Sequence, residues 1–228
     1  MSLLEVKDLT IRYDYKTVVD AVSFEVNRGE SVGLAGESGS GKSQTAMALL
    51  GLLPRNATRT GSIRFDHTEI STCNEQALDQ IRGRRVGMVF QDPMQALNPY
   101  LKIGKQLREI LLQHNIASGS AADTQVVAML ERVGLPDPER QFDVFPYQLS
   151  GGMRQRAMIA SALIAEPDLL IADEPTTALD VTVQAQILDL LEELRDNTAL
   201  LLITHDLGIV AGRCERLLVF ENGKLVES

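Results

Sequence analysis

The fold is decided by residues 31–43, Ser31-Val32-Gly33-Leu34-Ala35-Gly36-Glu37-Ser38-Gly39-Ser40-Gly41-Lys42-Ser43, followed by Gln44-Thr45-Ala46-Met47-Ala48-Leu49-Leu50. The first five residues are a short and mostly apolar run, which predicts a buried strand. The glycines and serines after it predict a loop, and the residues that follow predict a helix. A strand, a glycine-rich loop and a helix in this order are typical of the start of a parallel α/β layer.

The loop fits the Walker A pattern G-x-x-x-x-G-K-[ST] from Gly36 to Ser43. Glycines let successive backbone N–H groups face phosphate oxygens, and the helix N-terminus adds partial positive charge. In this motif Lys42 reaches the β- and γ-phosphates and the Ser43 hydroxyl coordinates Mg²⁺. A plain glycine- and serine-rich turn is the alternative, which the terminal Gly-Lys-Ser disfavours. The residues predicted to bind the phosphates of Mg-ATP are Gly36, Ser38, Gly39, Ser40, Gly41, Lys42, Ser43 and Gln44.

The segments on either side of this loop predict the rest of an α/β domain. Residues 3–13 alternate apolar and polar side chains and residues 18–26 do so more loosely, which predicts antiparallel strands with one solvated face. Further elements are expected as helices at 150–165 and 182–195, buried strands at 169–172 and 199–203, and a closing hairpin at 217–226 with its turn at Asn222-Gly223.

The middle of the chain has a different pattern. Between residues 103 and 133 apolar side chains recur at helical spacing, with a Ser/Gly/Ala-rich break at 117–122. The pattern predicts a helical subdomain at residues 93–146, inserted into a catalytic core formed by residues 1–92 and 147–228.

Two acids end the apolar run at 169–172. Because buried carboxylates are costly unless they are paired or metal-bound, and ligands of parallel α/β sheets bind at the carboxyl ends of strands, Asp173 and Glu174 predict a site. We expect Asp173 to hold Mg²⁺ and Glu174 to activate the attacking water. His205 follows the next predicted strand and could hydrogen-bond the γ-phosphate. The alternatives are two solvated acids and a structural histidine.

A second glycine pair begins a helix at Leu149-Ser150-Gly151-Gly152-Met153. It predicts another anion-binding helix N-terminus. Since the first loop already surrounds one nucleotide's phosphates, a second such terminus is redundant unless it serves a nucleotide on another molecule. The alternative is a capping serine followed by flexible glycines.

With these motifs in this order, essentially the whole chain resembles the ATP-binding cassette family. The resemblance implies an α/β P-loop NTPase core with an antiparallel β subdomain and an inserted helical subdomain, working as a dimer. It also implies the roles of single residues. Tyr13 (or, less well matched, Tyr15) stacks on adenine, and Gln91 of the Q-loop contacts Mg²⁺. The signature is formed by Ser150, Gly151 and Gly152, the Walker B motif ends with Asp173 and Glu174, the D-loop is 178–180 with Asp180, and the switch histidine is His205.

A narrower resemblance, to the oligopeptide/dipeptide/nickel importer ATPases, lies in Phe90-Gln91-Asp92-Pro93-Met94-Gln95-Ala96-Leu97-Asn98-Pro99. It implies an ATPase subunit that powers import of peptides or a related small solute at the cytoplasmic face of the cell (inner) membrane. The implied partners are a second ATPase subunit or domain, identical or not, permease subunits and a solute-binding protein. Members of that group usually continue beyond the closing hairpin, so an end at Ser228 suggests a shortened chain, such as half of a tandem ATPase, or a shorter relative.

Composition limits the other possibilities. The chain has 22 Lys+Arg against 31 Asp+Glu, a net charge of −9, which disfavours a nucleic-acid partner. The sequence shows no signal peptide and no apolar run of the roughly 20 residues that span a bilayer, so we expect a soluble chain that reaches a membrane through a partner. Related ATPases of DNA repair, chromosome organisation and translation are the alternative class, and the first two need long heptad arms that are missing here. A cassette that binds ATP without hydrolysis is disfavoured because Glu174, His205 and the signature are intact.

Overall fold

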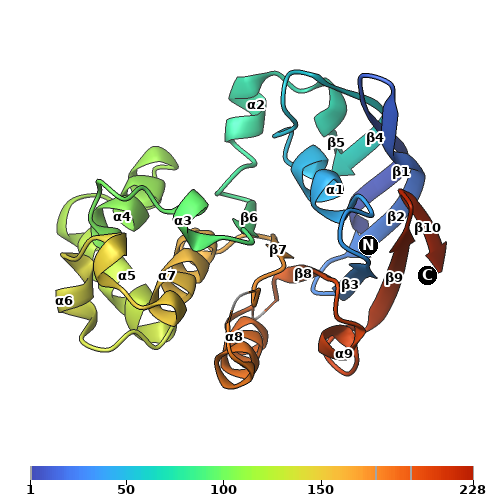
Figure 1. Ribbon diagram of the computed structural model, residues 1–228. Coiled ribbons are helices and arrows are strands. Elements are labelled where there is room, and N and C mark those ends of the chain that lie inside the picture. The colour runs from blue at the N-terminus through green and yellow to red at the C-terminus, as the bar shows by residue number, and fades with distance from the viewer. Residues whose placement is uncertain (1, 178, 196, 228) are drawn as a thin grey trace. The chain divides into compact units, whose positions relative to one another are not determined.

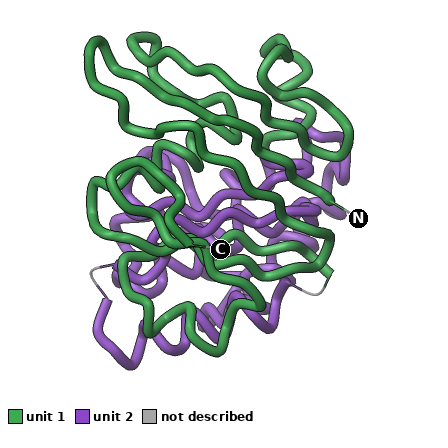
Figure 2. The backbone as a smooth tube through the Cα atoms, turned by 90° about the vertical axis from the view of Figure 1, so that its right-hand side faces the viewer, with its two compact units in different colours: residues 1–82, 197–228 green, residues 83–196 purple. Residues whose placement is uncertain are grey.

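Figure 1 shows the computed structural model, which describes residues 2–177, 179–195 and 197–227. The chain divides into two compact units, which Figure 2 shows in different colours. Unit 1 comprises Met1–Arg82 and Asn197–Ser228, and unit 2 comprises Gly83–Asp196. Two distant parts of the chain thus share unit 1, because strands from both ends pair there.

Unit 1 contains an antiparallel sheet with the strand order β2-β1-β4-β5. Its strands are β1 (Ser2–Tyr13), β2 (Lys16–Asn27), β4 (Ala57–Phe65) and β5 (Thr68–Glu69). The strands predicted at 3–13 and 18–26 are confirmed. The sequence did not predict β4, which is polar and exposed through much of its length and contains Gly61. β4 forms because it pairs with β1, and the apolar alternation in the sequence of β4 is too short to predict a strand.

Unit 1 also contains parallel strands that carry the phosphate loop. β3 (Ser31–Gly36) pairs in parallel with both β8 (Ala199–Thr204) and β9 (Arg216–Glu221), and β10 (Lys224–Glu227) closes an antiparallel hairpin with β9. β8 is buried along its whole length and β3 along all but its last residue, as near-continuous apolar strands require. Asn222 and Gly223 have φ of 49° and 81°, which gives the predicted hairpin its tight turn.

Short helices complete unit 1, and Figure 1 shows α1 beside the strands that precede it. α1 packs against β2 and β3, and α9 packs against β3 and β8. The helices of unit 1 are α1 (Lys42–Leu49), the 3-10 turn η1 (Ile70–Thr72), α2 (Glu75–Asp79) and α9 (Leu207–Val210).

In unit 2, the strands β6 (Val86–Val89) and β7 (Leu169–Asp173) pair in parallel. β6 lies directly against α7 (Gly151–Leu163), so closely that a Cβ atom on Gly87 would lie 2.2 Å from the carbonyl oxygen of Ala162. The strand predicted at 169–172 is confirmed and is fully buried.

The remaining elements of unit 2 are helical, and residues 93–146, all of which the structure describes, contain no strand. Their core is made by buried aliphatic side chains of α4 and α5, such as Leu107 and Leu130, each of which contributes about 1.5–3 kcal/mol by burial. These elements are α3 (Pro93–Ala96), α4 (Ile103–Gln113), α5 (Gly119–Arg132), α6 (Pro138–Phe142), the 3-10 turn η2 (Pro146–Gln148) and α8 (Val181–Leu194).

The break expected at 117–122 is wrong from residue 119 onward, because α5 already begins at Gly119. Glycine and serine are tolerated in the first turn of a helix, where N–H groups need no partner four residues earlier. Ala122 is fully buried and anchors that turn. Across the described residues, no helix combines the length and apolar character needed to cross a bilayer.

Candidate functional site

The phosphate loop lies between β3 and α1 of unit 1, as predicted. β3 ends at Gly36 and α1 begins at Lys42. Gly41 is the N-cap of α1 and has φ of 112°, in the left-handed region that favours glycine. The first turn of a helix presents backbone N–H groups that have no partner within the helix, so this arrangement suits an anion.

At two positions of the loop, a neighbouring backbone lies so close that only glycine fits. A Cβ atom on Gly36 would lie 2.1 Å from the carbonyl oxygen of Phe220, and one on Gly41 would lie 2.5 Å from that of Val18. Any side chain at either position would push the loop away from its neighbouring strands. A Cβ atom on Gly39 would meet nothing within 4 Å, so its φ of 82° is what favours glycine there.

Lys42 places a buried positive charge inside the loop. Its side chain is only 4% exposed, and Nζ donates to the carbonyl oxygens of Gly36 and Glu37, both at 2.8 Å. The hydroxyl oxygen of Ser40 lies 3.5 Å from Nζ. A buried ammonium needs such oxygen partners, and phosphate oxygens are of the same kind.

The other predicted residues of this loop differ in exposure. Ser38 and Gly39 are exposed at its tip, whereas Ser40 is buried. Ser43 and Gln44 lie in the first turn of α1 and are half-buried.

Tyr13, at the end of β1, contacts the helix of the phosphate loop. Its hydroxyl donates a hydrogen bond to Oε1 of Gln44, and burial raises the pKa of Tyr13. Tyr15, in the turn between β1 and β2, has its side chain entirely in solvent, with a relative exposure of 104%. The structure thus brings Tyr13, and not Tyr15, to the phosphate loop.

His205 is the remaining predicted residue of unit 1. Ala35 of β3 and Thr204 of β8 are register partners in parallel strands. Gly36 and His205, one residue further along each strand, therefore lie at the same edge of the sheet. His205 is exposed there.

In unit 2, the predicted acids and Gln91 follow two parallel strands. Val89 of β6 is the register partner of Ala172 of β7, so the residues after both strands meet at one edge. Asp173 ends β7 and is only 4% exposed, and Glu174 follows with φ of 46°. This left-handed conformation is uncommon for a residue with a side chain and turns Glu174 out of the strand direction.

Two neighbours hold one oxygen of the Glu174 carboxylate. Nε2 of Gln91 donates to Oε2 at 3.3 Å, and the hydroxyl of Thr177 donates to the same oxygen at 2.8 Å. The sequence interpretation gave Thr177 no role of its own. A hydroxyl residue three positions after the proposed base is the signal that could have found it.

The glycine pair of the signature begins α7. Ser150 is the N-cap, and its hydroxyl oxygen accepts from the backbone N–H of Met153 at 3.3 Å. A Cβ atom on Gly151 would meet nothing within 4 Å, whereas one on Gly152 would lie 3.3 Å from a methyl carbon of Val183 in α8. The start of α7 is thus open at Gly151 and packed against α8 at Gly152.

Asp180 is the N-cap of α8. Its Oδ1 accepts from the N–H groups of Thr182 and Val183, at 3.1 and 3.0 Å. This capping explains its residue type, and any contact with a nucleotide stays a prediction. Ala178, which the D-loop includes, lies outside the described residues.

The predicted site residues are divided between the two units. Unit 1 holds Tyr13, Gly36, Ser38, Gly39, Ser40, Gly41, Lys42, Ser43, Gln44 and His205. Unit 2 holds Gln91, Ser150, Gly151, Gly152, Asp173, Glu174 and Asp180. Among the described residues, no group of three or more His, Cys, Asp or Glu side chains is arranged to hold a metal ion by itself.

Comparison with known proteins finds one matching family and similar transport proteins. Residues 19–177 match the family described as "ABC transporter". The chain is 49% identical to the oligopeptide transport ATP-binding protein OppD of Salmonella typhimurium, over 99% of the chain and 69% of that protein. It is 47% identical to the dipeptide transport ATP-binding protein DppD of Haemophilus influenzae, over 100% of the chain and 71% of that protein.

Solved structures show the same fold. A dimeric post-hydrolysis state of the ATP-binding cassette MJ0796, bound to ADP and Pi, superposes with a TM-score of 0.86 at 28% identity, covering 98% of this chain and 97% of that one. CbiO1 from Clostridium perfringens, part of the ABC transporter complex cbiONQ, gives a TM-score of 0.82 at 28% identity, covering 99% and 87%.

Proposed function

The chain belongs to the ABC transporter family, and on that premise we propose that it is the ATP-hydrolysing subunit of a peptide importer. Its similarity to OppD and DppD covers nearly its whole length, which supports peptides as the cargo. The observation that carries the ATPase assignment is the buried ammonium of Lys42 inside the loop at the start of α1.

ATP binds with its β- and γ-phosphates on this loop. Lys42 exchanges its contacts with the carbonyl oxygens of Gly36 and Glu37 for contacts with phosphate oxygens, which carry more negative charge. The N–H groups at the start of α1 complete the cradle. Tyr13 stacks on the adenine ring.

Hydrolysis uses Glu174 as the general base. Its carboxylate accepts a proton from a water that attacks the γ-phosphorus, and the bond to the β-phosphate oxygen breaks. Gln91 and Thr177 hold Oε2, and this fixes the plane of the carboxylate. His205 hydrogen-bonds the γ-phosphate and reports its presence.

The residues fit a Mg²⁺ ion that accompanies the nucleotide. Mg²⁺ in phosphate sites takes one or two protein oxygens and completes its shell with phosphates and water, so a dedicated cluster of acids is not needed. The Ser43 hydroxyl, the Asp173 carboxylate, which is buried, and the Gln91 amide are the side chains that would supply such oxygens. When bound, the ion would neutralise charge that develops on the phosphates.

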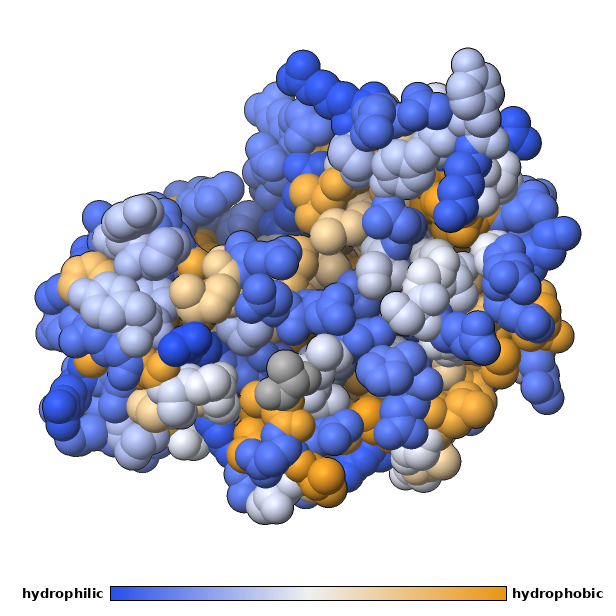
Figure 3. All heavy atoms as spheres, viewed as in Figure 1, coloured by the Kyte–Doolittle hydropathy of each residue, from blue (hydrophilic) through white to orange (hydrophobic). Residues whose placement is uncertain are grey.

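The working unit is a dimer in which the signature of one chain meets the nucleotide of the other. Gly151 leaves open space at the start of α7, where a phosphate can approach the backbone. Figure 3 shows apolar atoms gathered over α8, and Val181 at its start is 82% exposed. A dimer interface would cover such a side chain. The similar cassette MJ0796 is itself dimeric in its ADP- and Pi-bound structure.

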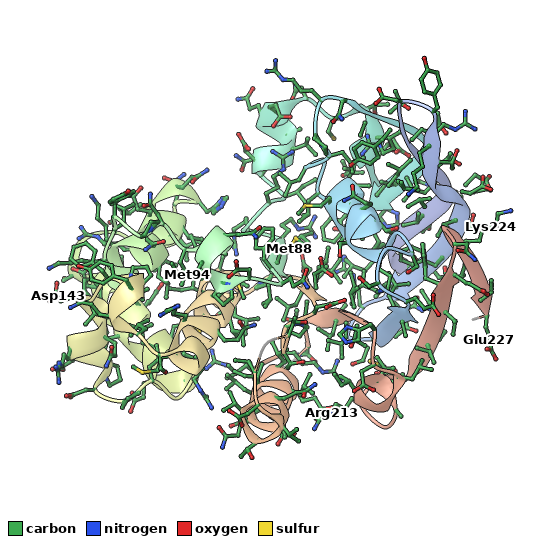
Figure 4. The ribbon with its side chains drawn as sticks, viewed as in Figure 1. Met88, Met94, Asp143, Arg213, Lys224 and Glu227 are labelled. Carbon is green, nitrogen blue, oxygen red and sulfur yellow. The ribbon has the colours of Figure 1, made fainter. Side chains whose placement is uncertain are left out.

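Transport requires contact with a permease at the cytoplasmic face of the membrane, and a solute-binding protein delivers the cargo. We assign the permease contact to the helical subdomain, residues 93–146, which ATP hydrolysis itself does not require. Met94 on α3, labelled in Figure 4, is 39% exposed and lies three residues after Gln91. A change at the γ-phosphate can thus reach this surface through Gln91.

The ATPase assignment is tested with the purified full chain. Glu174→Gln should keep ATP affinity while kcat falls by ~10²–10⁴-fold, because the general base is lost. Lys42→Ala should lose ATP binding itself, because the phosphates lose their charge partner. Near-normal turnover by Glu174→Gln would show that the base lies elsewhere, and unchanged ATP affinity of Lys42→Ala would remove the phosphate-loop assignment.

The cargo assignment is tested by uptake. Deleting the gene in its host should abolish uptake of a labelled tripeptide, and the wild-type gene should restore it whereas the Glu174→Gln gene should not. Normal peptide uptake in the deletion strain, together with an intact ATPase, would remove the cargo assignment and leave the ATPase assignment in place.

A further inference from the structure

A hydrogen bond connects the end of β1 to the phosphate-loop helix. The Tyr13 hydroxyl donates to Oε1 of Gln44, 31 residues later in the chain and in the first turn of α1. Lys42, two residues before Gln44, carries the charge inside the loop. The predicted base platform and the predicted phosphate cradle are therefore joined by one side-chain contact.

The backbone of Tyr13 is fixed by strand pairing on both sides. It is the register partner of Lys16 in β2 and of Ala57 in β4. Strand pairing sets the position of its Cα but leaves the side-chain torsions open. Because Oε1 of Gln44 accepts from the hydroxyl at the far end of the ring, the hydrogen bond fixes the direction in which the Tyr13 side chain extends relative to α1.

The donor stays available at physiological pH. A tyrosine hydroxyl is protonated at neutral pH, and burial raises the pKa of Tyr13 further. A glutamine side chain whose oxygen accepts a hydrogen bond has its torsions restricted. The pair thus orders both side chains before any ligand arrives, and this lowers the entropic cost of binding.

We propose that Gln44 is a positioning residue for the nucleotide base: its side-chain carbonyl holds Tyr13 in the orientation in which the ring stacks on the base. The inference rests on the proposed function of the site, and it gives the Gln44 side chain a role toward the base in place of the phosphate contact that the sequence predicts for it. It makes base recognition depend on a residue of the phosphate-loop helix. Stacking is tolerant of base identity because every base has a π-face, so purines of either kind should depend on it equally.

The test compares ligands with and without a base. The dissociation constants of AMP-PNP, GMP-PNP and inorganic triphosphate are measured by calorimetry in one Mg²⁺ buffer for the wild type, Gln44→Leu, Tyr13→Phe and the double variant. Gln44→Leu and Tyr13→Phe should each weaken both nucleotides about 5-fold, the lower end of what base stacking contributes, and leave triphosphate unchanged. The double variant should be no weaker than either single variant, because both remove the same hydrogen bond.

Kinetics separate positioning from a structural role. In both single variants KM for ATP should rise by the same factor while kcat stays unchanged, and thermal melting without nucleotide should match the wild type. Tyr15→Phe, which removes a hydroxyl from the neighbouring solvent-exposed tyrosine, is the matched control and should leave every constant unchanged.

Four outcomes would overturn the inference. Equal loss of affinity for triphosphate in Gln44→Leu would make Gln44 a phosphate ligand instead. Wild-type nucleotide affinity in Tyr13→Phe would show that the hydroxyl orients nothing, and additive losses in the double variant would show two independent effects. A wild-type chain that binds neither nucleotide nor triphosphate would overturn the proposed function as well, so the two failures are distinguishable.

Discussion

At the scale of single residues, the contacts around the proposed base explain how a flexible glutamate can act at a defined place. The left-handed backbone of Glu174 turns it away from the line of β7. Gln91, from the neighbouring strand end, and Thr177, from its own loop, then donate to the same carboxylate oxygen. Orientation of this kind matters because small misplacements of a catalytic group reduce rates strongly.

Thr177→Val provides a prediction at this scale. Valine has the shape of threonine but no hydroxyl, so the carboxylate of Glu174 loses its 2.8 Å hydrogen bond. We expect kcat for ATP to fall about 10-fold, less than the ~10²–10⁴-fold loss of removing the base, with KM unchanged. Steady-state ATPase kinetics measure both constants.

Thr177→Ser keeps the hydroxyl and should recover most of the activity. If serine is as slow as valine, the methyl group and not the hydrogen bond carries the effect. If valine is as fast as the wild type, Thr177 does not position Glu174.

At the scale of elements, single polar side chains connect strands that pair across long stretches of sequence. Glu30 closes the turn before β3, where its carboxylate accepts from the backbone and the amide of Asn27 at 2.7 and 3.1 Å. It also accepts from Nε of Arg216, the first residue of β9, at 2.9 Å. Since Arg216 is the register partner of Val32 in β3, Glu30 fixes the point where β3 and β9 begin to pair.

The pH dependence of unfolding tests this contact. Burial opposes the charge of Glu30, but the hydrogen bonds from Arg216 and Asn27 outweigh it and hold its pKa below the ordinary value of 4.5. A pKa lower in the folded than in the unfolded state stabilises the protein above the unfolded value, and this stabilisation is lost as the pH falls through the folded value. Glu30→Gln should therefore melt roughly 3–6 °C below the wild type at pH 7, from the ~1.5 kcal/mol of a charge-assisted hydrogen bond.

Melting curves between pH 7 and pH 3 should show this difference narrowing once the pH falls below 4.5. Glu131→Gln, which changes an exposed glutamate of α5, is the control and should follow the wild type throughout. A difference between wild type and Glu30→Gln that stays constant with pH would mean that the charge of Glu30 does not contribute.

At the scale of the whole molecule, the proposed machinery is complete only when a second chain supplies a signature. α7 begins with a serine N-cap and a glycine beside open space, an arrangement that suits an anion and is separate from the Walker A loop. Gly152 of α7 packs against Val183 of α8, and Val181, two residues earlier in α8, is 82% exposed.

Ser150→Arg provides a prediction at this scale. An arginine at the N-cap of α7 should block the approach of the partner's nucleotide while leaving the Walker A loop unchanged. We expect the isolated Ser150→Arg chain to keep its ATP affinity and its ATPase activity to fall by at least 10-fold. The ATPase activity of the wild type should rise more than linearly with protein concentration. Sedimentation must accompany the kinetics, since stable dimers would give a linear rise.

Ser120→Arg, in the first turn of α5, is the matched control and should keep wild-type activity. Full activity of Ser150→Arg, together with a monomer in sedimentation at all concentrations, would indicate a self-sufficient chain and would contradict the proposed dimer.

The sequence alone determined the features that depend on near neighbours in the chain. The apolar run of β3, the glycine pattern after it and the start of α1 are encoded within residues 31–50, and the Asn222-Gly223 hairpin is equally local. Periodicity and backbone conformational preference are properties of short segments, so they can be predicted without the fold.

Only the tertiary structure decided which distant residues meet. It placed Tyr13 beside Gln44 and left Tyr15 in solvent. It brought Gln91 and Thr177 to one oxygen of Glu174. It also formed β4, whose pairing with β1 could not be predicted from the residues of β4 alone. The physical reason is that strand register and packing between elements set such contacts. The partner of a side chain on another element cannot be predicted from the periodicity of the sequence around that side chain.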